Sequence, residues 1–423
     1  MTSPSGRLSA RYWIETAFPL DYAAQVMAGE QSTGTFIRVA GETDELREAH
    51  AARVESIQPL DVVDAPSLPG AGKPKGLNVW RRAEVELSWP LSNMGNSLPN
   101  VVATVAGNLF ELKPFSGLKL LDLKLPPSFL DRYQGPQFGV AGTRALTGVP
   151  HRPLVGTIIK PSVGLSPAAT AAMVDSLADG GIDFIKDDEL QADGPHCPFS
   201  ERLAAVMDVI NRHADRTGRK VMYACNITGE IDEMLARHDA VEAAGGTCVM
   251  ISANSIGLPA LVHLRRHARL AIHCHRNGWG IYGRSPAIGI SYIAYQKLWR
   301  LAGVDHMHVN GLANKFCEDD ASVIASAREC LTPMFDAPGR GCEIMPVFSS
   351  GQSVNQASGT WAALQSTDLI FACGGGIMGH PGGVAAGVRA IHQAWEAALA
   401  GVPPRQYAQS NRELREALQT FAS

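Results

Sequence analysis

The ten residues Gly180–Glu189, GGIDFIKDDE, carry the side chains most able to do chemistry in this chain. They place Lys186, Asp188 and Glu189 together at the end of an apolar strand. Because side chains alternate between the two faces of a strand, Lys186 and Asp188 are predicted to point one way and Asp187 the other. Glu189 joins the first pair if the strand ends there and the chain turns.

A lysine beside two carboxylates is compatible with two kinds of chemistry. It can form an ion pair, or its uncharged amine can capture CO2 as a carbamate. A carbamate and two carboxylates make an all-oxygen site that suits Mg2+, a hard cation. A surface ion-pair cluster at the end of a strand is the plainer interpretation, because such clusters are common.

Length and composition favour a large globular protein. The chain has 423 residues, of which 45% are hydrophobic and 18% charged, and its net charge is -4. This charge indicates neither nucleic acid nor an anionic membrane as a partner. The N-terminal sequence MTSPSGRLSARYW has no apolar signal segment, and no run of about 18 apolar residues predicts a membrane span. The eight cysteines form no CxxC pair, which favours reduced thiols in a cytoplasmic protein.

From about Gly142 onward, an apolar strand that ends in polar or glycine residues alternates with an amphipathic helix. Eight strands alternating with helices predict a (β/α)8 TIM barrel, and a doubly wound sheet is the alternative. The predicted strands are Leu154–Lys160, Ile182–Glu189, Lys220–Thr228, Thr247–Asn254, Leu270–Arg276, His306–Gly311, Glu343–Gly351 and Leu369–Gly376.

Residues 1–130 show no such repeat, and we expect an α+β domain with an antiparallel sheet there, followed by the barrel at 131–423. Polar residues gather at the carboxyl ends of the barrel strands, where barrel enzymes place their chemistry. Besides the lysine and carboxylates above, these residues are Lys160, His273, His275, Arg276, His306, His308, Ser349, Gly351 and Gly374–Gly376.

Three other patterns have both a functional and a structural interpretation. The pair His273 and His275 has the spacing of a zinc site, although a buried core histidine is the commoner role. The glycine-rich turns after the seventh and eighth strands, at Ser349–Gln352 and Cys373–Gly383, are where barrels commonly bind phosphate. The polar turns STGTF and GNLFELK, in the first domain, are by themselves typical of plain turns.

Together these motifs resemble the large subunit of ribulose-bisphosphate carboxylase/oxygenase (RuBisCO), and more closely its non-carboxylating relatives, the RuBisCO-like proteins of form IV type. The resemblance runs from EQSTGTF through GTIIKPSVGLS and GGIDFIKDDE to GGGIMGHP. It implies a ferredoxin-like α+β domain before the barrel, and a homodimer whose sites are shared between subunits.

The resemblance also implies roles for individual residues. Lys186 would be carbamylated (N6-carboxylysine) and would bind one Mg2+ per subunit with Asp188 and Glu189. Lys160 would move a proton, and His275 and Lys315, the latter on a closing loop, would complete the catalytic group. Contacts to a small sugar phosphate substrate would come from Glu30, Thr35, Asn108, Arg276, His308, Ser349, Gly351, Gly374 and Gly375.

The chain departs from the family pattern at four positions. Ser162 stands where a second lysine is usual, Phe36 replaces a tryptophan, Ser350 replaces a glycine and Trp279 replaces a histidine. The missing lysine removes a charge that carboxylation needs, and Trp279 is predicted to crowd a second phosphate. We therefore expect a substrate with one phosphate and no RuBisCO activity.

The retained residues suit stabilisation of an enediolate, and the resemblance leaves several reactions open. The leading hypothesis is decarboxylation of 3-oxo-isoapionate 4-phosphate in apiose and isoapionate catabolism, because Lys315 can meet a carboxylate. The alternatives are a transcarboxylase/hydrolase acting on the same compound, an enolase or isomerase of a methylthio-sugar phosphate in methionine salvage, and a catalytically silent scaffold.

Overall fold

The structure is a computed structural model that describes residues 6–34 and 39–422. The chain forms two compact units, and part of the sequence between two barrel strands belongs to the first of them. The first unit comprises Met1–Gln134, Gly278–Leu301 and Met334–Gly341, and the second comprises Gly135–Asn277, Ala302–Pro333 and Cys342–Ser423.

A five-stranded sheet of order β10-β4-β1-β3-β2 forms the centre of the first unit. Neighbours are antiparallel except β10, which runs parallel to β4. The strands are β1 (Arg7–Thr16), β2 (Arg53–Val63), β3 (Trp80–Pro90), β4 (Phe115–Lys124) and β10 (Ile288–Ile290). The helical segments are α1 (Leu20–Glu30), α2 (Asp44–His50), η1 (Leu91–Asn93), α3 (Leu98–Ala106), η2 (Asn108–Glu111), η3 (Pro127–Asp131), α9 (Trp279–Gly283) and α10 (Tyr292–Ala302).

The order of β1, α1, β2, β3, α3 and β4 along the chain, with β1 between β3 and β4, is that of a ferredoxin-like fold. The predicted α+β domain is therefore confirmed. The sequence did not predict the fifth strand, β10.

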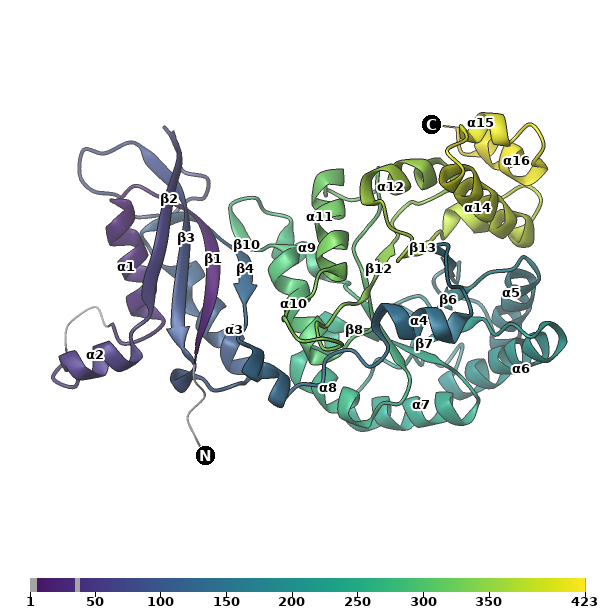
Figure 1. The fold of residues 1–423 in the computed structure, drawn as a ribbon, viewed down its shortest axis with the longest axis horizontal. Coiled ribbons are helices and arrows are strands. Elements are labelled where there is room, and N and C mark those ends of the chain that lie inside the picture. The colour runs from purple at the N-terminus through teal and green to yellow at the C-terminus, as the bar shows by residue number, and fades with distance from the viewer. Residues whose placement is uncertain (1–5, 35–38, 423) are drawn as a thin grey trace. The chain divides into compact units, whose positions relative to one another are not determined.

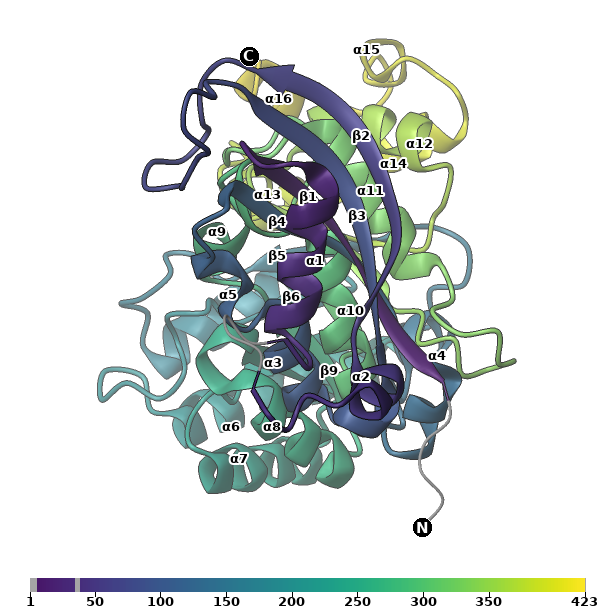
Figure 2. The same ribbon diagram turned by 90° about the vertical axis from the view of Figure 1, so that its left-hand side faces the viewer.

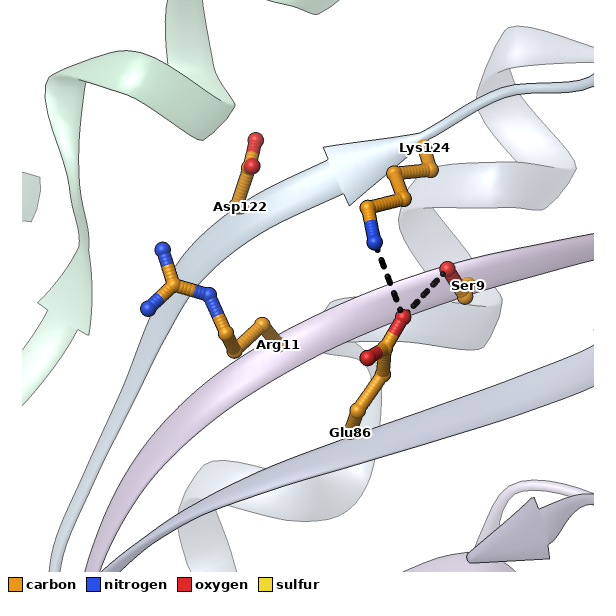
Figure 3. Close-up of a pocket in the computed structure, with 5 residues that line it drawn as sticks. All are labelled: Ser9, Arg11, Glu86, Asp122 and Lys124. Carbon is orange, nitrogen blue, oxygen red and sulfur yellow. Dashed lines mark hydrogen bonds and ion pairs between the residues drawn. The ribbon is translucent and has the colours of Figure 1, made fainter. Parts of the chain in front are cut away.

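Strand alternation explains the two faces of this sheet. Along β1, the side chains of Leu8, Tyr12 and Ile14 are buried, and Figure 2 shows α1 lying along the sheet. Residues of the opposite parity make the other face polar. Figure 3 shows a pocket on that face, lined by Ser9, Arg11, Glu86, Asp122 and Lys124.

The carboxylate of Glu86 in this pocket is held by cross-strand contacts. Glu86 Oε1 accepts hydrogen bonds from Ser9 Oγ at 3.0 Å and from Lys124 Nζ at 3.4 Å (Figure 3). Such pairs stabilise an exposed sheet face, and we assign the pocket to the sheet surface.

The second unit contains a closed barrel of eight parallel strands, surrounded by helices (Figure 1). The predicted TIM barrel is confirmed, and each predicted strand contains an observed one. The barrel strands are β5 (Leu154–Ile158), β6 (Phe184–Lys186), β7 (Met222–Asn226), β8 (Cys248–Ser252), β9 (Ala271–His275), β11 (His306–His308), β12 (Met345–Phe348) and β13 (Ile370–Ala372).

Helices connect these strands and close the chain. The helix before the first barrel strand is α4 (Gly139–Thr147). The others are α5 (Pro167–Asp179), α6 (Phe199–Thr217), α7 (Ile231–Ala243), α8 (Ala253–His267), α11 (Asp320–Leu331), η4 (Val354–Gln356), α12 (Ala357–Leu364), α13 (Gly375–Met378), α14 (Val384–Leu399), α15 (Pro404–Tyr407) and α16 (Arg412–Thr420).

The two ends of the barrel differ in character. At the end where strands begin, the buried carboxylate of Asp305 accepts hydrogen bonds from the backbone N–H groups of Phe138, Gly139 and Ile272, at 2.6, 3.0 and 2.8 Å. Arg265 Nη1 lies 3.2 Å from the same carboxylate. Burial raises the pKa of Asp305 despite these partners. This end is occupied by structural contacts, and the carboxyl ends of the strands carry the polar residues described next.

Two further findings concern the chain as a whole. All eight cysteines are free thiols, and of these only Cys317 is exposed. Among residues 6–34 and 39–422, no helix combines the length and apolar character needed to span a membrane.

Candidate functional site at the barrel mouth

Lys186 is the last residue of β6 and is completely buried. Its Nζ donates to the carbonyl oxygen of Asp187 at 2.7 Å and lies 3.4 Å from Glu189 Oε2. Burial lowers the pKa of Lys186, although the charges of Glu189 and Asp188 oppose this shift. The sequence prediction that Lys186 and Glu189 meet because the strand ends here agrees with this geometry.

Asp188 pairs with the lysine that ends the first barrel segment. Lys160 Nζ lies 2.6 Å from Asp188 Oδ2 and 2.8 Å from Ser162 Oγ. Burial alone would raise the pKa of Asp188, but hydrogen bonds from Lys160 and from the N–H of Leu190 bring it below its ordinary value. Asp188 is therefore an anion at neutral pH.

His275, at the end of β9, faces the same carboxylates. Its Nδ1 accepts the backbone N–H of Asn277 at 3.2 Å, which assigns the ring proton to Nε2. His275 Nε2 lies 3.4 Å from Glu189 Oε2. Burial and the charge of Lys186 lower the pKa of His275 to about 4, so the ring is neutral at pH 7.

The donor set of this cluster can be compared with what a metal ion requires. Asp188 and Glu189 offer carboxylate oxygens, but a protonated Lys186 would repel a cation. The lowered pKa makes the uncharged amine of Lys186 more accessible, and a carbamate on it would turn the buried cation into a third anionic oxygen ligand. In the carbamate form, these residues fit a hard divalent ion.

Asp187 lies on the opposite face of the strand, as alternation predicted. Its carboxylate accepts hydrogen bonds from Tyr223 Oη, from Arg202 Nε at 3.2 Å and from the N–H of Asn226 at 2.9 Å. Asp187, Arg202 and Tyr223 are all buried. This network fixes the backbone behind Lys186. It could not be predicted from the sequence, because its members come from three separate elements.

Histidines line the barrel interior beside the cluster. The ring centroids of His275 and His308 are 4.6 Å apart. His308 Nε2 lies 2.9 Å from His273 Nε2, and His308 Nδ1 lies 2.8 Å from Ser349 Oγ. His306 Nε2 lies 2.8 Å from Thr143 Oγ1 deeper in the barrel. Burial lowers the pKa of His306 to about 3, and it also lowers those of His273 and His308.

These contacts argue against a zinc site formed by His273 and His275. The two rings point into the barrel, but the structure gives His273 a histidine partner and places His275 against Glu189. His273 therefore has the core role, and His275 is the one at the mouth.

A second series of polar side-chain contacts joins Arg276 to the loop between β11 and α11. Arg276 Nη2 lies 2.9 Å from Glu318 Oε2, and Asn310 Nδ2 donates to the same oxygen at 2.6 Å. Ser350 Oγ donates to Asn310 Oδ1 at 2.9 Å. The sequence singled out Ser350 only as a departure from the family and gave no signal for Asn310 or Glu318, because their contacts cross between loops.

The loop residues predicted to contact substrate occupy the same rim. The N–H of Lys315 donates to the carbonyl oxygen of Ser350 at 3.2 Å, and its ammonium lies 5.3 Å from the centroid of the Phe316 ring. Gly351 has a φ of +89°, a left-handed conformation that favours glycine. A Cβ on Gly374 would lie 3.8 Å from Lys160 Cε, so the loop after β13 comes close to the segment that follows β5. Gly375 begins α13.

The remaining predicted contacts lie in the first unit or outside the described residues. Asn108 Nδ2 lies 3.4 Å from Glu30 Oε1, and both side chains are exposed. The structure thus brings these two residues together. Thr35 and Phe36 lie outside the described residues.

Another group of potential metal ligands, His238, Asp239 and His267, lies away from the mouth. His267 Nε2 and His238 Nδ1 lie 2.6 and 3.0 Å from Asp239 Oδ1. The N–H of Arg269 donates to His238 Nε2 at 3.1 Å, so the neutral ring carries its proton on Nδ1. A protonated nitrogen cannot bind a metal, and we interpret this group as a hydrogen-bonded tie between α7 and the end of α8.

Comparisons with known proteins confirm the family resemblance. Residues 10–129 match "Ribulose bisphosphate carboxylase large chain, N-terminal domain", and residues 139–421 match the catalytic domain of the same chain. A crystal structure of a rubisco-like protein from Burkholderia fungorum has a TM-score of 0.91 and 49% identity, covering 98% of this chain and 100% of that one.

The curated relatives with names that describe reactions include two that are similar to this chain over nearly its full length. The 3-oxo-isoapionate-4-phosphate transcarboxylase/hydrolase of Xanthobacter autotrophicus is 56% identical over 98% of this chain and 99% of its own length. The 3-oxo-isoapionate-4-phosphate decarboxylase of Rhizobium etli is 43% identical over 98% of this chain and 99% of its own length.

The buried histidines generate a prediction about acid stability. His306 binds no proton in the folded protein between pH 6.5 and about 3, whereas the unfolded chain binds one below its ordinary pKa. The free energy of unfolding should therefore decrease as pH falls below about 6.5. In His306→Gln, this decrease should be shallower by about 1.4 kcal/mol per pH unit, measured by urea unfolding between pH 6.5 and 4.5. The exposed control His151→Gln should keep the wild-type slope, and parallel curves for H306Q and wild type would contradict the prediction.

Proposed function

The chain belongs to the ribulose bisphosphate carboxylase large-chain family, and we propose that within it this protein is a non-carboxylating enzyme that decarboxylates 3-oxo-isoapionate 4-phosphate. The observation that carries the proposal is the contact between Lys160 and Asp188, 2.6 Å, beside the buried Lys186. It puts a proton donor next to the residues that would hold the metal ion. Both relatives named above are enzymes named for this same substrate.

The proposal includes one Mg2+ held by carbamylated Lys186, Asp188 and Glu189. When bound, the ion would polarise the ketone of the substrate and stabilise the negative charge that develops as CO2 leaves. The support is the chemistry of the donor set, in which a carbamate supplies the missing anionic ligand.

The side chains of the mouth then have separate tasks. Loss of CO2 breaks the bond between the carboxyl carbon and its neighbour, and the electron pair remains on the substrate as an enediolate. Lys160 or water supplies the proton that replaces CO2. Neutral His275 donates a hydrogen bond through Nε2 without adding charge, and Lys315, on the loop after β11, is available to a carboxylate. The glycine turns at Gly351, Gly374 and Gly375 would take the single phosphate.

Ser162 supports the absence of carboxylation. Lys160 donates to Ser162 Oγ at 2.8 Å, at the position where the family usually has a second lysine. One cationic group of the family pattern is therefore missing beside Lys160. Trp279, the other relevant departure, packs in the first unit with its ring centroid 4.6 Å from that of Tyr295.

A transcarboxylase/hydrolase reaction is a second candidate, because the relative with that name has 56% identity, against 43% for the decarboxylase. Release of the carboxyl group from the oxo acid would begin both reactions. They differ in whether the enediolate is protonated or accepts the carboxyl group again at another carbon before hydrolysis.

We further propose that the functional unit is a homodimer with shared sites. Glu30 and Asn108 are exposed on the first unit, whereas the lysine and carboxylates belong to the second. The family likeness assigns these two residues, with Thr35, to the site of a neighbouring subunit.

Labelled substrate tests the reaction. With 13C in the carboxyl carbon of 3-oxo-isoapionate 4-phosphate, we expect one equivalent of label as CO2 and bicarbonate by 13C NMR, and a slower release with Lys160→Met, in which water alone supplies the proton. Label that is retained in a new carboxylate would instead establish the transcarboxylase/hydrolase reaction. Deuterium exchange into methylthioribulose 1-phosphate, without any change in the oxo acid, would refute both and favour the isomerase.

Metal binding tests the carbamate independently of turnover. In CO2-free buffer, the affinity for Mg2+ measured by calorimetry should fall by about tenfold or more, because one of three anionic ligands is lost. Lys186→Met should bind Mg2+ equally weakly with and without CO2 while keeping its circular dichroism spectrum, and exposed Lys75→Met should behave as wild type. Since a carbamate forms from the neutral amine, the effect of CO2 should increase as pH rises through the lowered pKa of Lys186. Equal Mg2+ affinity of wild type in both buffers would exclude the carbamate.

Subunit mixing tests the shared site. Asn108→Ala and Lys186→Met should each be inactive alone. After random exchange in equal amounts, half of the dimers are mixed and each has one intact site, so activity should recover to about a quarter of wild type. No recovery, with exchange demonstrated by native mass spectrometry, would show that each site lies within one subunit.

A further inference from the structure

The guanidinium of Arg276, directly after β9, is held by a carboxylate from the loop after β11. Arg276 Nη2 lies 2.9 Å from Glu318 Oε2, and the two side chains are only 6% and 14% exposed. A pair so shielded from water is screened much less than a surface pair. Two opposite charges thus occupy a position that the sequence assigned to substrate.

Glu318 is anchored from its own side as well. Asn310 Nδ2 donates to Glu318 Oε2 at 2.6 Å, and Ser322 Oγ donates to Oε1 at 3.0 Å. Ser350 in turn donates to Asn310. Neither carboxylate oxygen depends on Arg276 alone for its position, so the carboxylate is a fixed part of the rim.

The backbone of this rim supports the same conclusion. Asn310 and Ser350 have φ values of 68° and 72°, in the left-handed region that side chains other than glycine rarely adopt. Such conformations persist where the surroundings hold them and are common at ligand sites. Here, the hydrogen bond between the two side chains joins the loop after β11 to the loop after β12.

The electrostatic consequence concerns which substrate group can approach Arg276. A phosphate there would meet the carboxylate of Glu318 at the same guanidinium. It would have to separate the pair, leaving a shielded carboxylate without its cation, or remain beside a like charge. A hydroxyl or carbonyl group can bond to the pair without either cost.

We propose that Glu318 is a specificity-determining residue, which neutralises Arg276 so that this part of the site accepts an uncharged oxygen group and rejects a second phosphate. The inference rests on the proposed function for the identity of the substrate, whose single phosphate binds elsewhere. It adds a residue and a physical reason for the choice between monophosphate and bisphosphate.

Binding of two simple probes tests this without turnover. The probes are pentane-1,5-diol bisphosphate and 5-hydroxypentyl phosphate, and the measurement is the ratio of their dissociation constants by calorimetry. In wild type, the second phosphate should not tighten binding. In Glu318→Gln, which removes the charge and keeps an oxygen for Asn310, the bisphosphate should bind about tenfold or more tighter while the monophosphate is unchanged.

Matched variants test whether the tighter binding of the bisphosphate depends on the charges of Arg276 and Glu318. Exposed Glu201→Gln changes net charge equally and should keep the wild-type ratio, and Glu318→Asp should also keep it because the charge remains. The double variant Arg276→Met with Glu318→Gln should lose the gain.

Several outcomes would overturn the inference: tighter bisphosphate binding by wild type, no gain in E318Q, or a gain that persists without Arg276. The wild-type ratio is decisive even where a variant does not fold. Because no probe is decarboxylated, a failure here is distinct from a failure of the proposed reaction.

Discussion

Lys186 is completely buried at the end of β6, and its amine can neither reach water nor remain an uncompensated cation. This constraint organises the site. Two carboxylates lie within the next three residues, and each has its own partner: Asp188 contacts Lys160, and Glu189 contacts His275.

On the other face of the strand, Asp187, Arg202 and Tyr223 hold the backbone in place. The position of the amine is thus fixed from both sides, as a site for precise chemistry requires.

Charge is distributed unevenly around this amine. The histidines of the barrel interior are neutral because burial lowers their pKa values, and at His275 and His308 nearby cations lower them further. Positive charge at the rim belongs to Lys160, Arg276 and Lys315. Of these, Lys160 and Arg276 already face carboxylates. The mouth of the barrel therefore combines neutral hydrogen-bond donors, two paired cations and a lysine on a loop. A site for a bisphosphate would instead need positive charge at both phosphate positions.

The departures from the family pattern acquire a physical meaning in this setting. Ser162 accepts a hydrogen bond from Lys160 instead of adding a second ammonium group. Ser350 takes a backbone conformation suited to glycine, and its hydroxyl bonds to Asn310, which positions Glu318. At both positions, a polar hydroxyl alters the contacts of a charged group. The protein thus keeps the framework of the family while changing the charges that face the substrate.

The sequence by itself determined the barrel, an α+β first domain and the clustering of Lys186, Asp188 and Glu189. These depend on periodicity and on neighbours within a few residues, which local sequence specifies. It also placed Asp187 on the opposite face. Only the tertiary structure decided that Gly278–Leu301 belongs to the first unit and that β10 is a parallel strand of its sheet. The same is true of the side-chain contacts that run from Arg276 through Glu318 and Asn310 to Ser350. Barrel closure brings the loops after β9, β11 and β12 together, and their contacts join residues 8 to 42 positions apart. No spacing rule in the sequence reports such contacts, because they depend on the packing of whole strands.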